Sequence, residues 1–258
     1  MINRIKEIYT YREMIIMLVR RDLRGRYKGS FLGFAWTFLN PLLQLAVYTL
    51  VFSVVMRSGI EKYYLFLFVA LIPWLAMANS VTGGATCITS QTGMVTKIYF
   101  PRQVLPITVV TTNFVNMLLC MVVVLIVCGC SIGLNIKVLW YLIPTMFVEY
   151  VLALGIVFLV SGITVYFRDM EHFLGIFVMA WQFLSPVMYS VDMVPEKLKG
   201  VYHLNAMTPV ITAYRQILYY KQAPEMKTML LSLVMGFAFL LLGWAVFARL
   251  EKRFAEVL

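Results

Sequence analysis

Charged side chains are scarce in this sequence of 258 residues: they make up 13% of it, against about 25% in soluble domains. Hydrophobic residues make up 62%, and the mean hydropathy is +0.84. The longest stretches outside the apolar runs are residues 1–33 and 191–227, which leaves no room for a sizeable soluble domain. We therefore expect one membrane domain, with any large soluble machinery on another chain.

Several chemical motifs are also absent. The sequence has no GxxxxGK[ST] phosphate loop, so we do not expect the chain to bind ATP in that way. It has no HExxH motif, and its two histidines, His172 and His203, fall on opposite predicted sides of the membrane. The four cysteines lie in or near apolar runs and are expected to be small buried side chains. We predict no catalytic residue, no metal site and no cofactor on this chain.

Six apolar stretches reach or approach the roughly 20 residues that a helix needs to cross a bilayer. They are residues 34–56, 64–82, 104–130, 138–166, 173–190 and 228–248. Backbone groups in hydrocarbon must be hydrogen-bonded within the protein, which favours helices. The sequence therefore predicts an all-α integral membrane protein, with an amphipathic interface helix in residues 1–33 and a six-helix transmembrane domain in residues 34–258.

The distribution of Lys and Arg predicts the topology, because these residues accumulate in short cytoplasmic loops. The first 33 residues hold eight of them, and six spans place the basic C-terminus on the same side. Both termini are therefore predicted to be cytoplasmic. The net charge of +10 suits anionic lipid or phosphate headgroups, and it does not indicate nucleic acid because there is no soluble basic module.

Residues 4–28 show helical amphipathicity, with a basic face that suits the membrane interface. This segment is either a topology anchor or a platform that meets a phosphate-bearing lipid or a cytoplasmic partner. Gly25, Gly29 and Gly33 follow at intervals of four, and we interpret them as a flexible corner before the first span.

Two loops carry further patterns. Residues 83–103 are predicted to be cytoplasmic and contain the apolar run 95–100, which is either an interfacial turn or a docking knob for a soluble partner. Residues 191–227 are predicted on the outer side. Helical spacing over 209–220, with a proline in the first turn, favours a re-entrant helical hairpin over a plain extracellular loop.

Within the spans, Glu149 is the one acidic residue well inside an apolar run, where a charge costs about 2.5–3.5 kcal/mol. We favour a structural role for it over a functional one. Four aromatic residues are candidates either for lining a path for sugars or for packing inside the bundle: Tyr48, Phe52, Phe183 and Tyr189.

Together these segments resemble the membrane subunit of type-2 ABC exporters for cell-surface polysaccharides, the family of O-antigen, capsule and teichoic-acid exporters. The run LVRRDLRGRYKGSFLGFAWTFLNPLLQLAVYTLVFSVV (18–55) looks like its interface helix and first span. KIYFPRQVLPIT (97–108) looks like its cytoplasmic coupling helix. YFRDMEHFLGIFVMAWQFLSPVMYSVDMVP (166–195) is similar to its fourth-to-fifth span signature, and NAMTPVITAYRQILY (205–219) to its extracellular gate, although Ala206 replaces the usual proline.

The resemblance implies a homodimer in the bacterial inner membrane, paired with two copies of an ATP-binding subunit that holds ATP and Mg. It implies export of a lipid-linked polysaccharide carried on undecaprenyl diphosphate. Docking to the ATPase would use Lys97, Ile98, Tyr99, Phe100, Pro101 and Arg102. The entrance for the lipid diphosphate would use Arg20, Arg21, Arg24, Arg26 and Lys28. The outer gate would use Asn205, Thr208, Pro209, Tyr214 and Arg215.

Two other functions remain as alternatives. An efflux permease for small hydrophobic compounds shares much of this architecture. A membrane enzyme acting on a polyprenyl phosphate would need clustered acidic or histidine residues, and Asp169, Glu171 and His172 form the one such group. Their place beside Arg168 at the end of a span favours a solvated connection between helices.

Overall fold

The computed structural model describes residues 2–25 and 29–257, and every regular element in that part of the chain is a helix. Five helical segments are long and apolar enough to cross a membrane. They comprise α3 (Trp36–Thr49) with the π-helical turn η2 (Leu50–Val55), α4 (Tyr63–Thr86), α6 (Val104–Ile132), α8 (Leu142–Thr164) and α12 (Met226–Leu250). The prediction of a multi-pass, all-helical membrane protein is therefore confirmed.

Shorter elements connect these spans. The longer ones are α1 (Ile2–Thr10), α2 (Arg12–Gly25), α5 (Thr92–Lys97), α9 (Met170–Leu184), α10 (Glu196–Leu204) and α11 (Met207–Leu218). The remainder are η1 (Gly33–Ala35), η3 (Thr89–Gln91), α7 (Ile136–Leu139), η4 (Val191–Met193), η5 (Glu251–Arg253) and α13 (Phe254–Val257).

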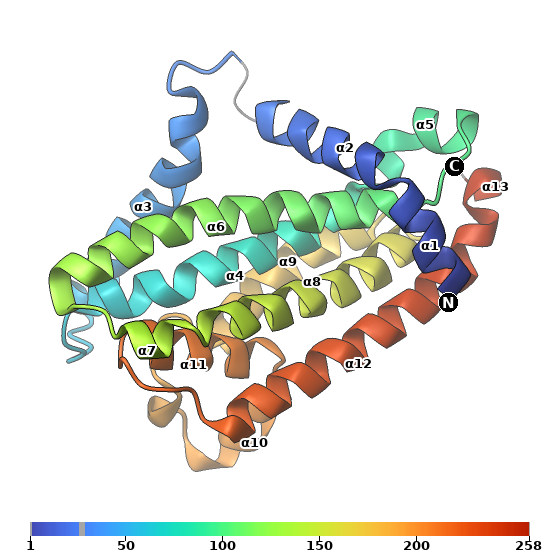
Figure 1. Ribbon diagram of the computed structural model, residues 1–258. Helices are drawn as coiled ribbons and strands as arrows, with labels where there is room; N and C mark the ends of the chain where they lie inside the picture. The colour runs from blue at the N-terminus through green and yellow to red at the C-terminus, as the bar shows by residue number, and fades with distance from the viewer. Residues whose placement is uncertain (1, 26–28, 258) are drawn as a thin grey trace.

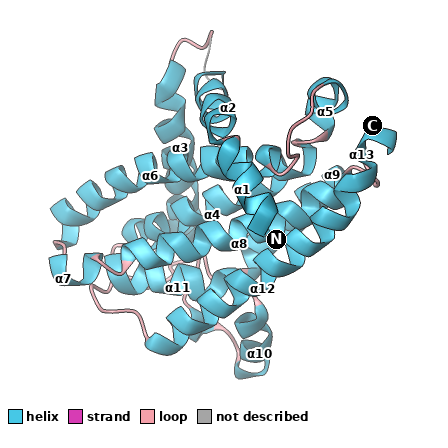
Figure 2. Cartoon of the chain, turned by 45° about the vertical axis from the view of Figure 1, so that its right-hand side comes forward, coloured by secondary structure: helices cyan, strands magenta, loops and turns pink. Residues whose placement is uncertain are grey.

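The long helices α4, α6, α8 and α12 run alongside one another, and α3 stands at an angle to them (Figure 1). Both ends of the chain lie at one end of this bundle, together with α1, α5 and α13, whereas α7, α10 and α11 lie at the other end (Figure 1). Figure 2, turned by 45°, shows the same separation, with α2 above the bundle and α10 below it. The molecule therefore has two distinct ends, as a membrane-crossing protein requires.

The central helix of the bundle is α4, because it packs against α3, α6, α8, α9 and α11. Its residues from Leu65 to Leu71 are almost completely buried. In α3, by contrast, no part of the most apolar stretch is buried. The first span is therefore the one least attached to the rest of this chain.

Glycines set the closest helix contact, between α8 and α12. A methyl group on Gly243 would overlap the main-chain carbonyl of Gly155, and a methyl group on Gly155 would overlap the backbone of Leu240. Gly236 lies one heptad before Gly243 and approaches the carbonyl of Val148. Small residues let helix backbones approach closely in a membrane, where van der Waals packing drives helix association.

The expected fifth span, residues 173–190, is shorter than predicted. The helix α9 ends at Leu184, because Ser185 is extended (φ −104°, ψ 144°) and Pro186 follows it. A residue before proline is disfavoured in the α region, and proline itself has no N–H to continue the helix. Tyr189 therefore lies beyond the helix to which the sequence assigned it.

Three other boundaries differ from the predictions. The N-terminal segment is two helices separated by Tyr11, and not one. The pair Gly83–Gly84 continues α4 and does not begin a loop, since a Cβ on Gly84 would lie 2.6 Å from Cγ1 of Val157. The outer helix α11 begins at Met207, two residues before the predicted start.

The glycine corner is supported. Gly29 and Gly33 have positive φ angles of 87° and 47°, and a Cβ at either position would meet no atom within 4 Å. Backbone conformation explains these two glycines, since residues other than glycine rarely adopt such angles. The chain turns there from α2 into the first span.

Replacing Gly243 with alanine should separate α8 from α12 and lower stability by about 2 kcal/mol or more, because the added methyl has no space. The melting temperature can be followed by size-exclusion chromatography of the detergent-solubilised protein after heating. Gly175→Ala is the matched control: it lies in α9 with no atom within 4 Å of its Cβ position, and the change should be neutral or slightly stabilising. Equal melting temperatures for the two variants would contradict this account of the α8–α12 contact.

Candidate functional site

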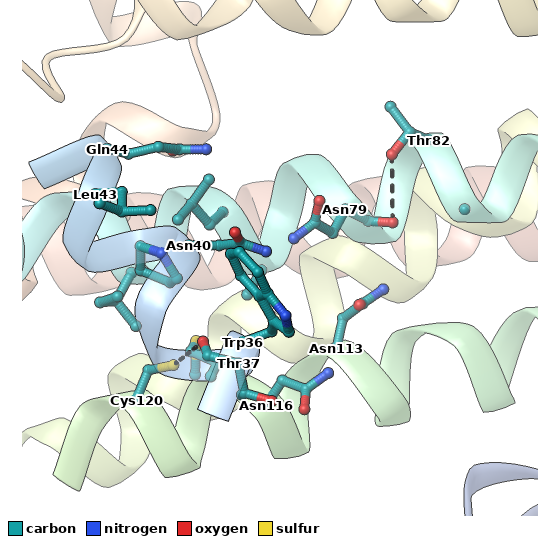
Figure 3. A pocket seen from close by; sticks show the side chains of 16 residues that line it. Trp36, Thr37, Asn40, Leu43, Gln44, Asn79, Thr82, Asn113, Asn116 and Cys120 are labelled. Carbon is teal, nitrogen blue, oxygen red and sulfur yellow. Dashed lines mark hydrogen bonds between the residues drawn. The ribbon is translucent and has the colours of Figure 1, made fainter. Parts of the chain in front are cut away.

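A polar cavity of about 630 Å³ lies between α3, α4 and α6, although the helices around it are strongly apolar. Five side-chain amides line it: Asn40 and Gln44 from α3, Asn79 from α4, and Asn113 and Asn116 from α6. Figure 3 shows the amides of Asn40 and Asn79 directed toward the same space from opposite sides, with Trp36 beside them. We call this space the amide cleft.

The amide cleft continues toward the interface helix α2. A second cavity of about 400 Å³ shares Asn79, Gly83 and Asn113 with it and is also lined by Arg21 and Asp22. The two cavities therefore adjoin, and together they extend from the basic helix α2 to the space between α3, α4 and α6.

The predicted entrance residues lie on α2, as far as the structure describes them. Arg20, Arg21 and Arg24 are exposed, while Leu18 and Val19 are buried on the face that packs against α6. Arg21 also pairs with its neighbour Asp22 at 3.1 Å, so part of its charge is compensated. Arg26 and Lys28 lie outside the described residues.

The predicted coupling segment is divided between surface and interior. Ile98 and Tyr99 are 58% and 80% exposed, whereas Phe100 is 3% exposed and belongs to a buried hydrophobic cluster that also contains Phe247 and Phe254. Lys97 is exposed and ends α5, Pro101 is buried, and Arg102 is partly buried. Phe100 therefore anchors the segment, and the side chains of Ile98 and Tyr99 project from it.

The sequence did not indicate that both chain ends contact this segment. The hydroxyl of Tyr99 donates to Oε1 of Glu7 at 3.4 Å, and the hydroxyl of Tyr11 donates to the carbonyl of Tyr99 at 3.4 Å. Beside them, Nε2 of Gln103 donates to Oε2 of Glu251 at 2.7 Å, and Arg4 forms an ion pair with the same carboxylate. The coupling segment is thus joined to α1 and to the end of α12.

At the opposite end, the predicted gate residue Arg215 is buried, with 4% of its surface exposed. Its guanidinium donates to the carbonyls of Val187 at 2.6 Å, Tyr189 at 2.9 Å and Phe66 at 3.4 Å. It also stacks 3.5 Å from the centre of the Phe66 ring. Arg215 therefore fastens α11 to α4 and to the chain that follows α9.

The neighbouring residue Tyr214 is fully buried and donates to Oε2 of Glu149 at 2.5 Å. This contact gives Glu149 the structural role that we favoured, since it joins α8 to α11. Thr208 and Pro209 are buried in the first turn of α11. Helix α11 is accordingly part of the protein interior and is not loosely attached to it.

Asn205 holds the turn between α10 and α11. Its Nδ2 donates to the carbonyl of Leu184 at 3.1 Å and to Oγ of Ser185 at 2.9 Å, while its Oδ1 accepts from Trp181 at 2.9 Å. Its four-way hydrogen-bonding capacity suits this position. The turn is therefore fixed to the end of α9.

The four candidate aromatics lie around the same outer region, in different environments. Nε2 of Gln182 in α9 donates to the hydroxyl of Tyr48 in α3 at 3.4 Å, so these two helices are neighbours there. Phe52 stacks on Tyr63 with 6.2 Å between ring centres. Phe183 is 55% exposed, and the hydroxyl of Tyr189 donates to its carbonyl at 2.7 Å.

The sequence analysis missed the amide cleft altogether. A signal was present, because each amide interrupts an apolar run, and Asn40 with Gln44 and Asn113 with Asn116 are spaced to share a helix face. Among the residues that the structure describes, no group of three His, Cys, Asp or Glu side chains is arranged to hold a metal ion.

Comparisons with known proteins agree with this architecture. A family model described as ABC-2 type transporter matches residues 13–219. The chain is 34% identical over 261 residues to the O-antigen export system permease protein RfbA of Myxococcus xanthus, and the alignment covers 99% of each chain. Two proteins of the same name from Klebsiella pneumoniae are 30% and 29% identical, over 95% of each chain.

The family match runs from α2 to just beyond α11, and the alignments with the relatives extend over nearly the whole length. These matches agree with a transport component and not with a catalytic one. We conclude that the chain belongs to the ABC-2 type transporter family, as a membrane subunit.

Proposed function

We propose that this chain is the permease subunit of an exporter that moves a lipid-linked polysaccharide, O-antigen or a related surface polymer, across the bacterial inner membrane. The observation that carries the proposal is the nearly end-to-end similarity to permeases named for O-antigen export. The amide cleft below a basic helix supports it, since the cargo combines a lipid diphosphate with sugars. Undecaprenyl diphosphate is the proposed carrier.

Membership of an ABC transporter family implies an ATP-binding partner subunit. We infer two copies of that subunit, which hold ATP and Mg, and two copies of this chain. The two exposed apolar helices support a homodimer: α3 is not buried, and α9 exposes Phe173, Ile176 and Phe183. Because Tyr48 and Gln182 join α3 to α9, both helices would face the second copy together.

The proposed topology has six crossings. With 15 residues, α9 is about 22 Å long, and the extended residues after it complete a short fifth crossing. The position of both chain ends at one end of the bundle supports an even number of crossings (Figure 1). That end would be cytoplasmic, and α10 and α11 would form the re-entrant hairpin on the outer side.

In the proposed mechanism, closure of the ATP-binding subunits presses on Ile98 and Tyr99. The hydrogen bond between Gln103 and Glu251 would pass this displacement to α12, and a path would open between the two copies. The lipid diphosphate would enter beside Arg20, Arg21 and Arg24. Since Arg215 and Tyr214 fix α11 in the protomer and Asn205 fixes the turn before it, the outer gate would move at α10.

Deleting the gene should cause lipid-linked polymer to accumulate on the cytoplasmic side of the membrane, because the exit route is lost. Polymer can be quantified in membrane extracts and at the cell surface, with and without the gene restored. Normal surface polymer in the deletion strain, together with increased sensitivity to small hydrophobic compounds, would contradict the proposal and favour the drug-efflux alternative. Loss of the polyprenyl-linked precursor itself would favour the membrane enzyme.

Truncating both Ile98 and Tyr99 to alanine should weaken binding of the ATP-binding subunit, because exposed apolar side chains at a contact centre carry much of its energy. We expect a loss of about 2 kcal/mol, roughly 30-fold in affinity, in pull-down titrations from membranes. Thr96→Ala, also exposed and on α5, is the control and should bind normally. Phe100→Ala should instead lower the melting temperature, since it empties a buried site. Normal binding by the double variant would remove the docking role.

A further inference from the structure

We propose that the amide cleft is a binding site for neutral sugar units of the cargo, formed within one protomer by α3, α4 and α6. The proposal rests on the proposed function and adds to it a site for the glycan, separate from the basic entrance for the diphosphate. The volume of the amide cleft, about 630 Å³, lies within the usual range of small-molecule sites, roughly 300–1,000 Å³.

The depth of the amides sets them apart from interfacial residues. Asn40 and Asn79 each lie about 10 Å along the helix axis from the nearer end of their spans, and Asn116 lies about 18 Å from it. The hydrocarbon core is about 30 Å thick, so the cleft extends toward its middle. Polar residues at such depth face a cavity or a partner, because lipid offers no hydrogen bond.

The usual structural role of such residues is to join helices by hydrogen bonds. That role does not explain these amides. Within the described part of the chain, no hydrogen bond links the side chains of Asn40, Gln44 or Asn79 to another helix. Both polar atoms of Asn116 are buried without a partner there, as is Oγ1 of Thr37 on the opposite wall. The wall therefore holds hydrogen-bonding capacity that the described residues leave unused.

The lining favours a neutral polyhydroxyl ligand over an anion or an acyl chain. None of the described residues that line the larger cavity is charged, so a phosphate would meet no cation in it. An acyl chain would leave the amides unsatisfied, at a cost for each polar group. Amides both donate and accept, as sugar hydroxyls do, and the Trp36 ring beside them offers a flat surface to the C–H face of a sugar (Figure 3).

The neighbouring cavity offers a separate site for the diphosphate of the carrier lipid. Arg21 lines it, and Asn79, Gly83 and Asn113 are common to both cavities. A lipid diphosphate held beside Arg21 would therefore direct the sugar attached to it into the amide cleft. The positive charge of Arg21 would bind the diphosphate of the carrier, and hydrogen bonds from the amides would bind the glycan.

The test compares two probes on the full chain in nanodiscs: undecaprenyl diphosphate, and the same lipid bearing a neutral disaccharide. Dissociation constants are measured by microscale thermophoresis. We expect wild type to bind the disaccharide lipid about tenfold more tightly, since two or three hydrogen bonds are gained. The double variant Asn40→Leu, Gln44→Leu changes two residues that line the amide cleft and not the Arg21 cavity. It should reduce this preference to less than about twofold and leave binding of the bare lipid unchanged.

Two further variants serve as controls, one away from the amide cleft and one at the proposed diphosphate site. Thr111→Val, on the face of α6 that contacts Tyr150, should keep the tenfold preference. Arg21→Gln should weaken both lipids by the same factor. Unchanged binding of the bare lipid shows that the double variant is folded. If it fails to fold, the exposed Gln44→Leu repeats the test with one substitution.

Three results would overturn the inference. They are equal binding of the two lipids by wild type, retention of the full preference by the double variant, and loss of both lipids by a folded double variant. In each case the proposed function stands. Failure of wild type to bind either lipid, combined with normal polymer export in the deletion strain, would instead defeat the proposed function, and this inference with it.

Discussion

The interior of a bilayer supplies no water, so each polar group placed there needs a partner inside the protein. This constraint decides how the outer part of the molecule is built. Arg215 donates to three carbonyls and stacks on the Phe66 ring, and one carboxylate oxygen of Glu149 accepts from the hydroxyl of Tyr214. Each ionisable residue has its own partners, and both sets of contacts end on α11. The helix is consequently fixed to α4 and α8 by contacts that would be costly to break.

The same need for hydrogen-bond partners explains why we interpret the amide cleft as a binding site. The polar atoms of Asn116, buried without a partner among the described residues, point to a ligand or solvent that is bound during function. The ionisable residues Glu149 and Arg215 lie on α8 and α11, whereas the amides of the cleft lie where α3 faces α4 and α6. The buried ionisable contacts and the amide cleft are therefore separated in space.

Hydrophobic runs predicted the spans because they report directly on the lipid environment, and the order of the helices follows from them. Helix ends depended on local backbone chemistry, as Ser185 before Pro186 shows, and on packing, as Gly84 against Val157 shows. The sequence also could not predict which of two consecutive aromatic side chains is exposed to solvent: Tyr99 is exposed and Phe100 is buried. The amide cleft needed the arrangement of three helices, because Asn40, Asn79 and Asn113 are distant in sequence and meet only in the folded chain.

The distribution of contacts also indicates which parts can move. Glycine packing joins α8 to α12, and Arg215 and Glu149 join α11 to α4 and α8, so these helices are packed into one unit. The first span is held less firmly: it is unburied, follows the glycine corner at Gly29 and Gly33, and meets α9 through the 3.4 Å contact of Tyr48 with Gln182. Since α3 forms one wall of the amide cleft, any displacement of α3 changes the shape of the cleft. Opening a path beside α3 and releasing a sugar from the cleft would then be one movement, and this would link cargo binding to transport without a separate gate inside the membrane.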